Sequence, residues 1–157
     1  MQGISKALIA LALLTVLGIV LAIAFLSKAM QMPLSFSNDI ASPKDRIKED
    51  DIIVLNDRIV IAIPNAFLAR FTDTNSMDPV LDAEANAIEI VPKSPEDIAI
   101  GDIIAYQAND GIIVHRVVEI GYDESGWYAI TKGDNNAVVD GKVRFDAIKG
   151  IVVAIIY

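Results

Sequence analysis

The chain of 157 residues has room for one modest domain and a short extra segment, and its apolar share of 54% exceeds that of ordinary soluble domains. Its formal charge is -8, and the absence of cysteine excludes thiol catalysis, zinc–thiolate sites and disulfide bonds. Since His115 is the sole histidine, a zinc site built on several imidazoles is also excluded, and we expect neither a metal nor another cofactor.

The first element in chain order is an uncharged apolar run, residues 7–26, which follows a short tail, residues 1–6. As a helix rising 1.5 Å per residue, this run would span about 30 Å, the thickness of a bilayer core. The alternative is a cleaved secretory signal peptide with a weak cleavage site at residues 27–29. The apolar part of such peptides is usually shorter, about 7–15 residues, so we predict a retained transmembrane helix.

Residues 27–50 follow as a polar stretch with two prolines and no clear period, which predicts a linker. Lys6 and Lys28 are the only charges of the apolar run and its flanks, so the remainder holds 11 of the 13 basic side chains against 21 acidic ones, a balance of -10. Nucleic-acid phosphates call for a basic patch, so we expect no nucleic-acid partner.

Residues 51–157 are predicted to form a β-rich domain. Two runs rich in Ile and Val, 51–55 and 58–63, are separated by Asn56-Asp57 and predict a hairpin. A short helix is expected to begin near Ser76 or Asp78. Five further strands are predicted at residues 87–91, 102–107, 111–120, 126–131 and 147–156. So many short strands favour a mainly β, antiparallel domain, either a sandwich or a partly closed barrel.

Three segments carry side chains that could perform chemistry: residues 74–79 (TNSMDP), residues 113–117 (IVHRV), and residues 132–136 (KGDNN), which Asp140 follows. They supply a hydroxyl, an imidazole and two carboxylates. A serine hydroxyl is a poor nucleophile until a base takes its proton, and imidazole suits that task near neutral pH. A carboxylate behind the imidazole fixes its tautomer and stabilises the imidazolium.

Each of these side chains also has a purely structural interpretation. Ser76 in front of an Asp-Pro pair is a good helix N-cap. His115 lies in an alternating strand, where a partly buried histidine is common. Residues 133–136 have the composition of a tight turn, and Asp140 precedes a glycine, a common hairpin pair. Residue types alone leave both interpretations open.

The three segments, in this order, resemble the conserved boxes of the type I signal peptidase family. Residues 76–79 (SMDP) resemble its nucleophile box, Ser-Met-Glu-Pro. Residues 114–117 (VHRV) resemble its base box, where archaeal and endoplasmic-reticulum members carry histidine and bacterial members usually carry lysine. Residues 132–138 (KGDNNAV), with Asp140 following, resemble the last box of the histidine branch. The resemblance covers roughly residues 72–155.

This resemblance implies a signal-peptidase-like antiparallel β domain behind one N-terminal transmembrane helix. It implies a serine endopeptidase that cleaves signal peptides from exported preproteins, with Ser76 as nucleophile, His115 as general base and Asp140 as the acid that orients the histidine. Asp134 corresponds to a second, supporting aspartate. The family's oxyanion hole uses the backbone N–H of the nucleophile and a hydroxyl two residues earlier, which here implies Ser76 and Thr74.

The chain departs from the family at Asn75, which replaces a glycine and leaves the oxyanion geometry open, although Asn tolerates positive φ better than most residues. A second hypothesis is therefore a catalytically silent, membrane-tethered β domain that binds peptides or partner subunits. A self-cleaving repressor resembles this fold, but it would use a lysine base and a basic DNA-binding segment. A distance within about 3.5 Å between the Ser76 hydroxyl and a His115 ring nitrogen would favour the enzyme.

The orientation of the predicted anchor decides the location of the domain. Lys6 lies on one side, and on the other side lie Lys28 and three basic residues of the linker, Lys44, Arg46 and Lys48. Counting these charges favours a cytoplasmic domain. The last three lie about 18–22 residues from the anchor, at the edge of the range of the rule, and the resemblance implies the extracytoplasmic face. We expect a single-pass membrane protein with an extracytoplasmic domain, whose partners are the bilayer and signal peptides.

Overall fold

The computed structural model describes residues 15–21, 40–109 and 111–157, and the chain divides into two compact units, residues 1–39 and 40–157. Residues 15–21 are helical. The remainder of the predicted anchor, residues 7–26, lies outside the described residues, as do the predicted tail and most of the predicted linker. None of the helices formed by the described residues combines the length and the apolar character needed to cross a membrane.

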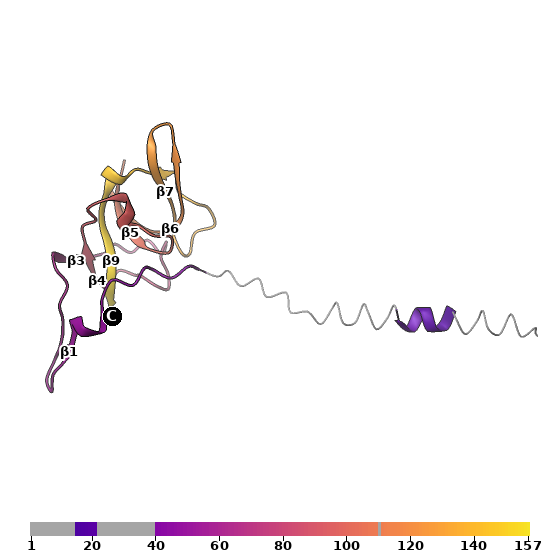
Figure 1. Ribbon diagram of the computed structural model, residues 1–157, viewed down its shortest axis with the longest axis horizontal. Coiled ribbons are helices and arrows are strands. Elements are labelled where there is room, and N and C mark those ends of the chain that lie inside the picture. The colour runs from indigo at the N-terminus through magenta and orange to yellow at the C-terminus, as the bar shows by residue number, and fades with distance from the viewer. Residues whose placement is uncertain (1–14, 22–39, 110) are drawn as a thin grey trace, which may run out of the picture. The chain divides into compact units, whose positions relative to one another are not determined.

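The second unit is mainly antiparallel β and contains two sheets (Figure 1). The smaller sheet is the predicted hairpin, formed by β1 (Ile52–Val54) and β2 (Ile59–Ile61). The larger sheet has the strand order β3-β4-β9-β5-β6-β7-β8. Its strands are β3 (Ala66–Arg70), β4 (Asn86–Ile90), β5 (Ile103–Ala108), β6 (Gly111–Asp123), β7 (Gly126–Lys132), β8 (Lys142–Val143) and β9 (Ile148–Ile156). Short 3-10 turns occur at η1 (Glu49–Asp51), η2 (Pro95–Asp97) and η3 (Phe145–Ala147).

The prediction of a mainly β, antiparallel domain is confirmed, but the predicted closure is not observed. The larger sheet stays open, with β3 and β8 as its edge strands. A sandwich does not form either, because both strands of the smaller sheet are exposed along their whole length. Closure requires the two edge strands to pair with each other, and β8 has only two residues to offer.

Buried apolar side chains lie on both faces of the larger sheet. Neighbouring strand residues point to opposite faces, so Ile103 and Ile104 of β5 belong to different clusters. The cluster on the first face contains Ile98, Ile104, Tyr106, Val117, Ala129, Val143, Ile148 and Ile151. The cluster on the second face contains Met77, Leu81, Ala85, Ala87, Ile103 and Val152. Met77 and Leu81 therefore hold the segment after Ser76 against the sheet.

The short helix predicted near residue 76 does not form, and residues 76–80 form turns instead. The backbone N–H groups of Val80 and Leu81 both donate to the Met77 carbonyl, at 2.8 and 3.0 Å. The Asp82 carboxylate then accepts hydrogen bonds from two following backbone N–H groups. Such a side-chain acceptor competes with continuation of a helical hydrogen-bond ladder, so the segment stays a series of turns.

The end of the predicted linker packs against the β domain. The Arg46 guanidinium donates to both carboxylate oxygens of Asp102, at 2.8 and 2.6 Å, and the Lys44 backbone N–H donates to the same carboxylate. Asp102 is fully buried, and only 12% of the Arg46 side chain is exposed. Gly101 has φ +97°, and a Cβ there would lie 2.2 Å from the Ser42 carbonyl oxygen. The compact unit accordingly begins at Ile40 rather than at residue 51.

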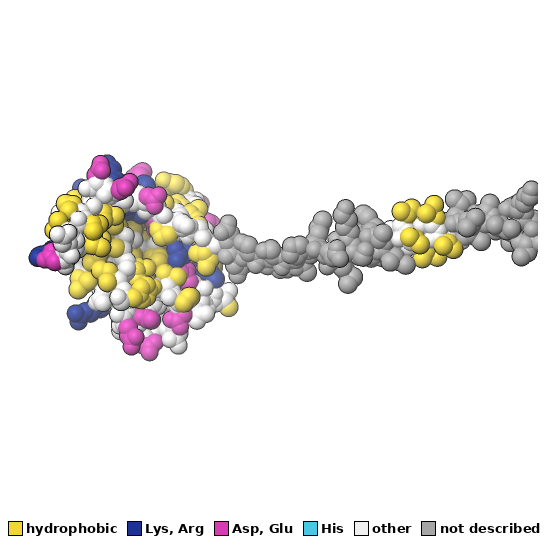
Figure 2. Space-filling model, turned by 90° about the horizontal axis from the view of Figure 1, so that it is seen from below, with side chains coloured by type: hydrophobic (Ala, Val, Ile, Leu, Met, Phe, Trp, Pro, Cys, Tyr) yellow, Lys and Arg dark blue, Asp and Glu magenta, His cyan; other side chains and the backbone are white. Residues whose placement is uncertain are grey.

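The surface of the β domain mixes acidic and apolar side chains. Figure 2 shows both kinds gathered in separate patches over one face. The β1–β2 hairpin contributes many of the exposed apolar groups, among them Val54, 72% exposed, and Ile59, 64% exposed. This distribution agrees with the acidic balance of the sequence.

Candidate active site

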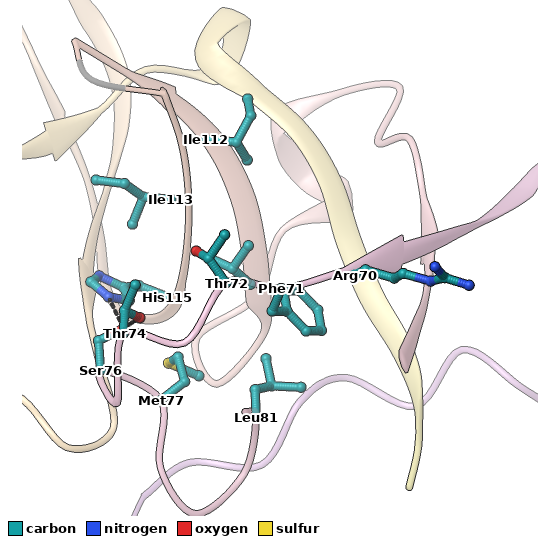
Figure 3. A pocket seen from close by; sticks show the side chains of 11 residues that line it. Arg70, Phe71, Thr72, Thr74, Ser76, Met77, Leu81, Ile112, Ile113 and His115 are labelled. Atoms are coloured by element: carbon teal, nitrogen blue, oxygen red, sulfur yellow. Dashed lines mark hydrogen bonds between the residues drawn. The ribbon is translucent and has the colours of Figure 1, made fainter. Parts of the chain in front are cut away.

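The structure brings Ser76 and His115 into direct contact. Ser76 lies in the turn segment that follows β3, and His115 lies on β6, where it pairs with Ile104 of β5. His115 Nε2 lies 3.1 Å from Ser76 Oγ, within hydrogen-bond reach, as the dashed lines of Figure 3 show. The imidazole is 6% exposed and is therefore held by its surroundings.

Asp140 lies on the other side of the imidazole. Its Oδ2 is 2.6 Å from His115 Nδ1. Because a carboxylate can only accept hydrogen bonds, Nδ1 carries the ring proton and donates a hydrogen bond to Asp140 Oδ2. Nε2 is then free to accept the hydroxyl proton of Ser76. The backbone N–H of Asp140 donates to the Thr131 carbonyl at 2.7 Å, which ties the acid to the end of β7.

Asp134, the second predicted aspartate, lies away from the imidazole. Its carboxylate accepts two hydrogen bonds from the Arg116 guanidinium, at 2.8 and 2.7 Å, and both side chains are buried. Arg116 also donates to the Gly101 carbonyl at 2.8 Å. Since Arg116 follows His115 in a strand, the two side chains point to opposite faces of the sheet. The geometry therefore assigns the contact with the imidazole to Asp140 and leaves Asp134 a supporting position.

Asn75 occupies the position where the resemblance implies glycine, and its φ is +55°. The left-handed conformation is thus retained, and Asn is among the residues that tolerate it. The Asn135 side-chain amide donates to the Asn75 carbonyl at 2.9 Å, and the Asn135 backbone N–H donates to the Ser76 carbonyl at 3.0 Å. A Cβ at Gly133 would lie 2.5 Å from that same carbonyl oxygen, so only glycine fits there. Residues 133–136 therefore support the turn that presents the nucleophile.

Thr74 Oγ1 lies 3.1 Å from Ser76 Oγ. With the Ser76 hydroxyl proton directed at His115, the Thr74 hydroxyl is the donor in this contact. Among the described residues, no hydrogen bond uses the backbone N–H of Ser76. The backbone N–H of Ser76 is thus available to a substrate carbonyl, whereas the Thr74 hydroxyl would have to turn its proton away from Ser76 Oγ to reach one.

A pocket of about 470 Å³ opens beside these groups (Figure 3). Its lining is largely apolar and consists of Arg70, Phe71, Thr72, Thr74, Ser76, Met77, Leu81, Ile112, Ile113, Val114 and His115. Two unpaired strand edges adjoin it, because β3 is an edge strand and residues 111–115 of β6 pair with β5 alone. The pocket can therefore receive an extended chain with its backbone groups facing these edges.

Comparisons of the chain with protein-family models, curated proteins and solved structures find no match. Within residues 15–21, 40–109 and 111–157, no group of three or more His, Asp or Glu side chains is placed to hold a metal ion. What the site can do follows from its own geometry, which is that of a hydroxyl, an imidazole and a carboxylate joined in sequence by hydrogen bonds.

Sequence reasoning did not find three buried polar residues near the site, Tyr106, Thr131 and Arg116. The hydroxyl groups of Tyr106 and Thr131 donate to Asp140 Oδ2, at 3.1 and 2.8 Å. Burial, with a smaller effect of the nearby Asp140 charge, raises the pKa of Tyr106 to about 12. The available signal was a polar side chain at a core position of an apolar strand, but that signal identifies no partner until the strand register is known.

Proposed function

We propose that this protein is a membrane-anchored serine endopeptidase of the signal peptidase type, with the histidine base of the archaeal and endoplasmic-reticulum branch. The observation that carries the proposal is the continuous Ser76–His115–Asp140 hydrogen-bond chain, with contacts of 3.1 and 2.6 Å. A hydroxyl within reach of a base, and a base oriented by a carboxylate, is the arrangement that activates a serine nucleophile. The antiparallel sheet around it supports a signal-peptidase-like fold.

The proposed reaction is acyl transfer. Ser76 Oγ attacks the scissile carbonyl carbon while its proton passes to His115 Nε2, and Asp140 stabilises the resulting imidazolium. The tetrahedral intermediate collapses with cleavage of the C–N bond, and His115 gives its proton to the leaving amine. A water molecule then attacks the acyl-serine ester by the same proton route, which releases the acid product and restores the serine hydroxyl.

The negative charge of the tetrahedral intermediate needs preorganised donors. The backbone N–H of Ser76 makes no hydrogen bond among the described residues, and the Thr74 hydroxyl lies 3.1 Å from Ser76 Oγ, so these two groups are the proposed donors. One such donor typically contributes about 3–4 kcal/mol to lowering the barrier. The positive φ of Asn75 gives the nucleophile turn its shape at the position where the donors converge.

The substrate is proposed to be an extended segment of an exported preprotein, with small residues just before the cut. An extended peptide gains backbone hydrogen bonds by adding to a free sheet edge, and pockets beside that edge select alternate side chains. The edge of β3 and residues 111–115 of β6 offer such edges next to Ser76. Phe71, Met77 and Ile113 make the pocket apolar, which suits the side chains that end a signal peptide.

The uncharged run at residues 7–26 is proposed to hold this domain at the extracytoplasmic membrane surface, where the apolar region of a signal peptide ends. Its partners would then be membrane lipid and signal peptides, and partner subunits stay an open part of the proposal.

The test is cleavage of a preprotein by the full chain in detergent, with substitutions at the three bonded residues. Ser76→Ala and His115→Ala are each expected to lower kcat at least about 10⁴-fold. Asp140→Asn reverses the tautomer preference of the imidazole and should lower kcat by about 10⁴-fold. Ser125→Ala, on the exposed β6–β7 turn, serves as the control and should cleave normally.

The outcome separates the peptidase from the silent binding domain. Cleavage by the unaltered chain, lost in both the Ser76 and His115 variants while the thermal unfolding curve is retained, supports the peptidase. If the unaltered chain binds the preprotein and never cuts it, the peptidase proposal is overturned and the catalytically silent domain takes its place. Full activity of Asp140→Asn would show that cleavage does not depend on the carboxylate at His115, because Asp134 is paired with Arg116 on the opposite face of the sheet.

A further inference from the structure

One carboxylate oxygen, on the Asp140 side chain that is 25% exposed, collects three hydrogen bonds beside the imidazole. Asp140 Oδ2 accepts from His115 Nδ1 at 2.6 Å, from the Thr131 hydroxyl at 2.8 Å and from the Tyr106 hydroxyl at 3.1 Å. Thr131 is fully buried and Tyr106 is 4% exposed. Hydrogen bonds to a charged acceptor are stronger than those between neutral groups, and burial strengthens them further.

The strand register explains why these two hydroxyl groups meet at this oxygen. Tyr106 of β5 pairs with Ile113 of β6, and Thr131 of β7 pairs with Val117 of β6. His115 lies midway between those two partners and shares their face of the sheet. The two hydroxyl groups therefore approach the imidazole from the strands on either side of it, and Asp140 lies where all three side chains converge.

We propose that Tyr106 and Thr131 are positioning residues that fix Asp140 Oδ2 opposite His115 Nδ1. This inference rests on the proposed function, because it concerns the same proposed reaction. A carboxylate held by a single donor can rotate or slide along that donor, whereas an oxygen with three donors from three strands has one position. The tautomer that leaves Nε2 free to accept the Ser76 proton is thereby maintained.

The two hydroxyl groups also weaken the attraction of Asp140 for a protonated imidazole. Each neutral donor withdraws negative charge from Oδ2. The protonated imidazole is then stabilised less, relative to the neutral ring, than it would be beside a carboxylate without these donors. Tyr106 stays a donor at all relevant pH values, since its pKa is raised to about 12, mainly by burial. Arg116, which follows His115 in β6, pairs with Asp134 on the opposite face of the strand.

The kinetic test uses Tyr106→Phe and Thr131→Val, each of which removes one hydroxyl with little change of shape. We expect each variant to lower kcat about tenfold, the effect of losing one hydrogen bond to a charged group, with little change in KM. The acid limb of kcat/KM against pH should move to higher pH, because Asp140 then attracts the protonated imidazole more strongly. Thr131→Ser retains the hydroxyl and should restore the unaltered profile.

A second measurement does not depend on cleavage. His115 is the sole histidine, so ¹⁵N-histidine NMR of the full chain in detergent reports on this ring alone. In the unaltered chain we expect the tautomer with the proton on Nδ1. In Tyr106→Phe and Thr131→Val, the pH midpoint of ring titration should lie above that of the unaltered chain. Tyr122→Phe alters a tyrosine that is 73% exposed and should leave the midpoint unchanged.

The two measurements keep this inference separate from the proposed function. If the unaltered chain cuts no preprotein, the proposed function fails, and the NMR titration still tests the positioning role. An unchanged or lowered midpoint in both variants would overturn the inference even if cleavage is observed. If Thr131→Val does not fold, Tyr106→Phe alone decides, because it removes a single oxygen atom.

Discussion

Glu89 of β4 is a buried carboxyl outside the site. It is 2% exposed, and its Oε1 has no hydrogen-bond partner among the described residues. Burial disfavours the charged form and raises the pKa of Glu89 above its ordinary value of 4.5. The folded chain then binds this proton more tightly than the unfolded chain does. The contribution of Glu89 to stability is therefore most favourable at low pH and declines as the pH rises above about 4.5.

Replacing Glu89 by Gln, which stays neutral, should remove this decline. We expect Glu89→Gln to raise the Tm of the full chain in detergent at pH 7 by about 2–4 °C, the shift that roughly 1 kcal/mol produces in a chain of this size. At pH 4 the Tm of the variant should not exceed that of the unaltered chain. Thermal unfolding across this pH range checks the prediction, and Glu119→Gln on the exposed part of β6 is the matched control. An equal rise in Tm at pH 7 and at pH 4 would show that the effect does not come from deprotonation of Glu89.

The sequence predicted the members of the candidate site well, because their residue types and order resemble a known set of boxes. Residue types alone could not decide between Asp134 and Asp140, since both follow the same strand, and only the resemblance implied Asp140 as the acid. Which aspartate contacts His115 depends on the path of the chain after β7, and that path is set by tertiary structure. Tyr106 and Thr131 were missed for a related reason, because only the pairing register places them around one carboxylate.

At the scale of elements, short runs rich in apolar residues and separated by turn residues predicted seven strands, and all seven form, with ends shifted by up to three residues. The two strands that were missed are β3 and β8. The β3 residues Ala-Phe-Leu-Ala-Arg do not alternate, and β8 has two residues, too few for any period. The predicted closure into a barrel failed because it depends on contact between edge strands, which no local pattern encodes.

The segment that precedes β1 is held by one buried ion pair, Arg46 with Asp102. Removal of Arg46 would leave a fully buried carboxylate without its counter-charge, which typically costs about 3–5 kcal/mol. We expect Arg46→Ala to lower the free energy of unfolding by that amount, as measured by denaturant unfolding of the full chain in detergent. Arg58→Ala breaks an exposed pair with Asp57 and should have no measurable effect. Equal effects in the two variants would contradict a specific role for the buried pair.

At the scale of the whole molecule, the acidic β domain and the apolar run at residues 7–26 have opposite solvent preferences. The run has no charged residue, whereas the rest of the chain carries -10 apart from the two flanking lysines. This contrast supports a protein divided between bilayer and water. The side of the membrane on which the domain lies is the part of the proposal that the charge count opposes.

The absence of cysteine offers a direct test of location. Ser125→Cys on the exposed β6–β7 turn should react with a membrane-impermeant maleimide in intact cells that produce the full chain, because the domain is proposed to face outward. Gln2→Cys, before the apolar run, should react only after the membrane is permeabilised. The reverse pattern would place the domain in the cytoplasm. Reaction of both variants in intact cells would argue against a membrane-spanning run.

The segment around Arg46, which packs against the β domain, also determines where proteolysis can separate this domain from the rest of the chain. A protease that cuts before residue 40 would release the β domain with the Arg46–Asp102 pair intact. A cut just before β1 would remove Arg46 from the fragment and leave the buried Asp102 carboxylate without its ion-pair partner. A stable fragment therefore has to retain the segment around Arg46, and recombinant truncations that start at Ile40, where the compact unit begins, would do so.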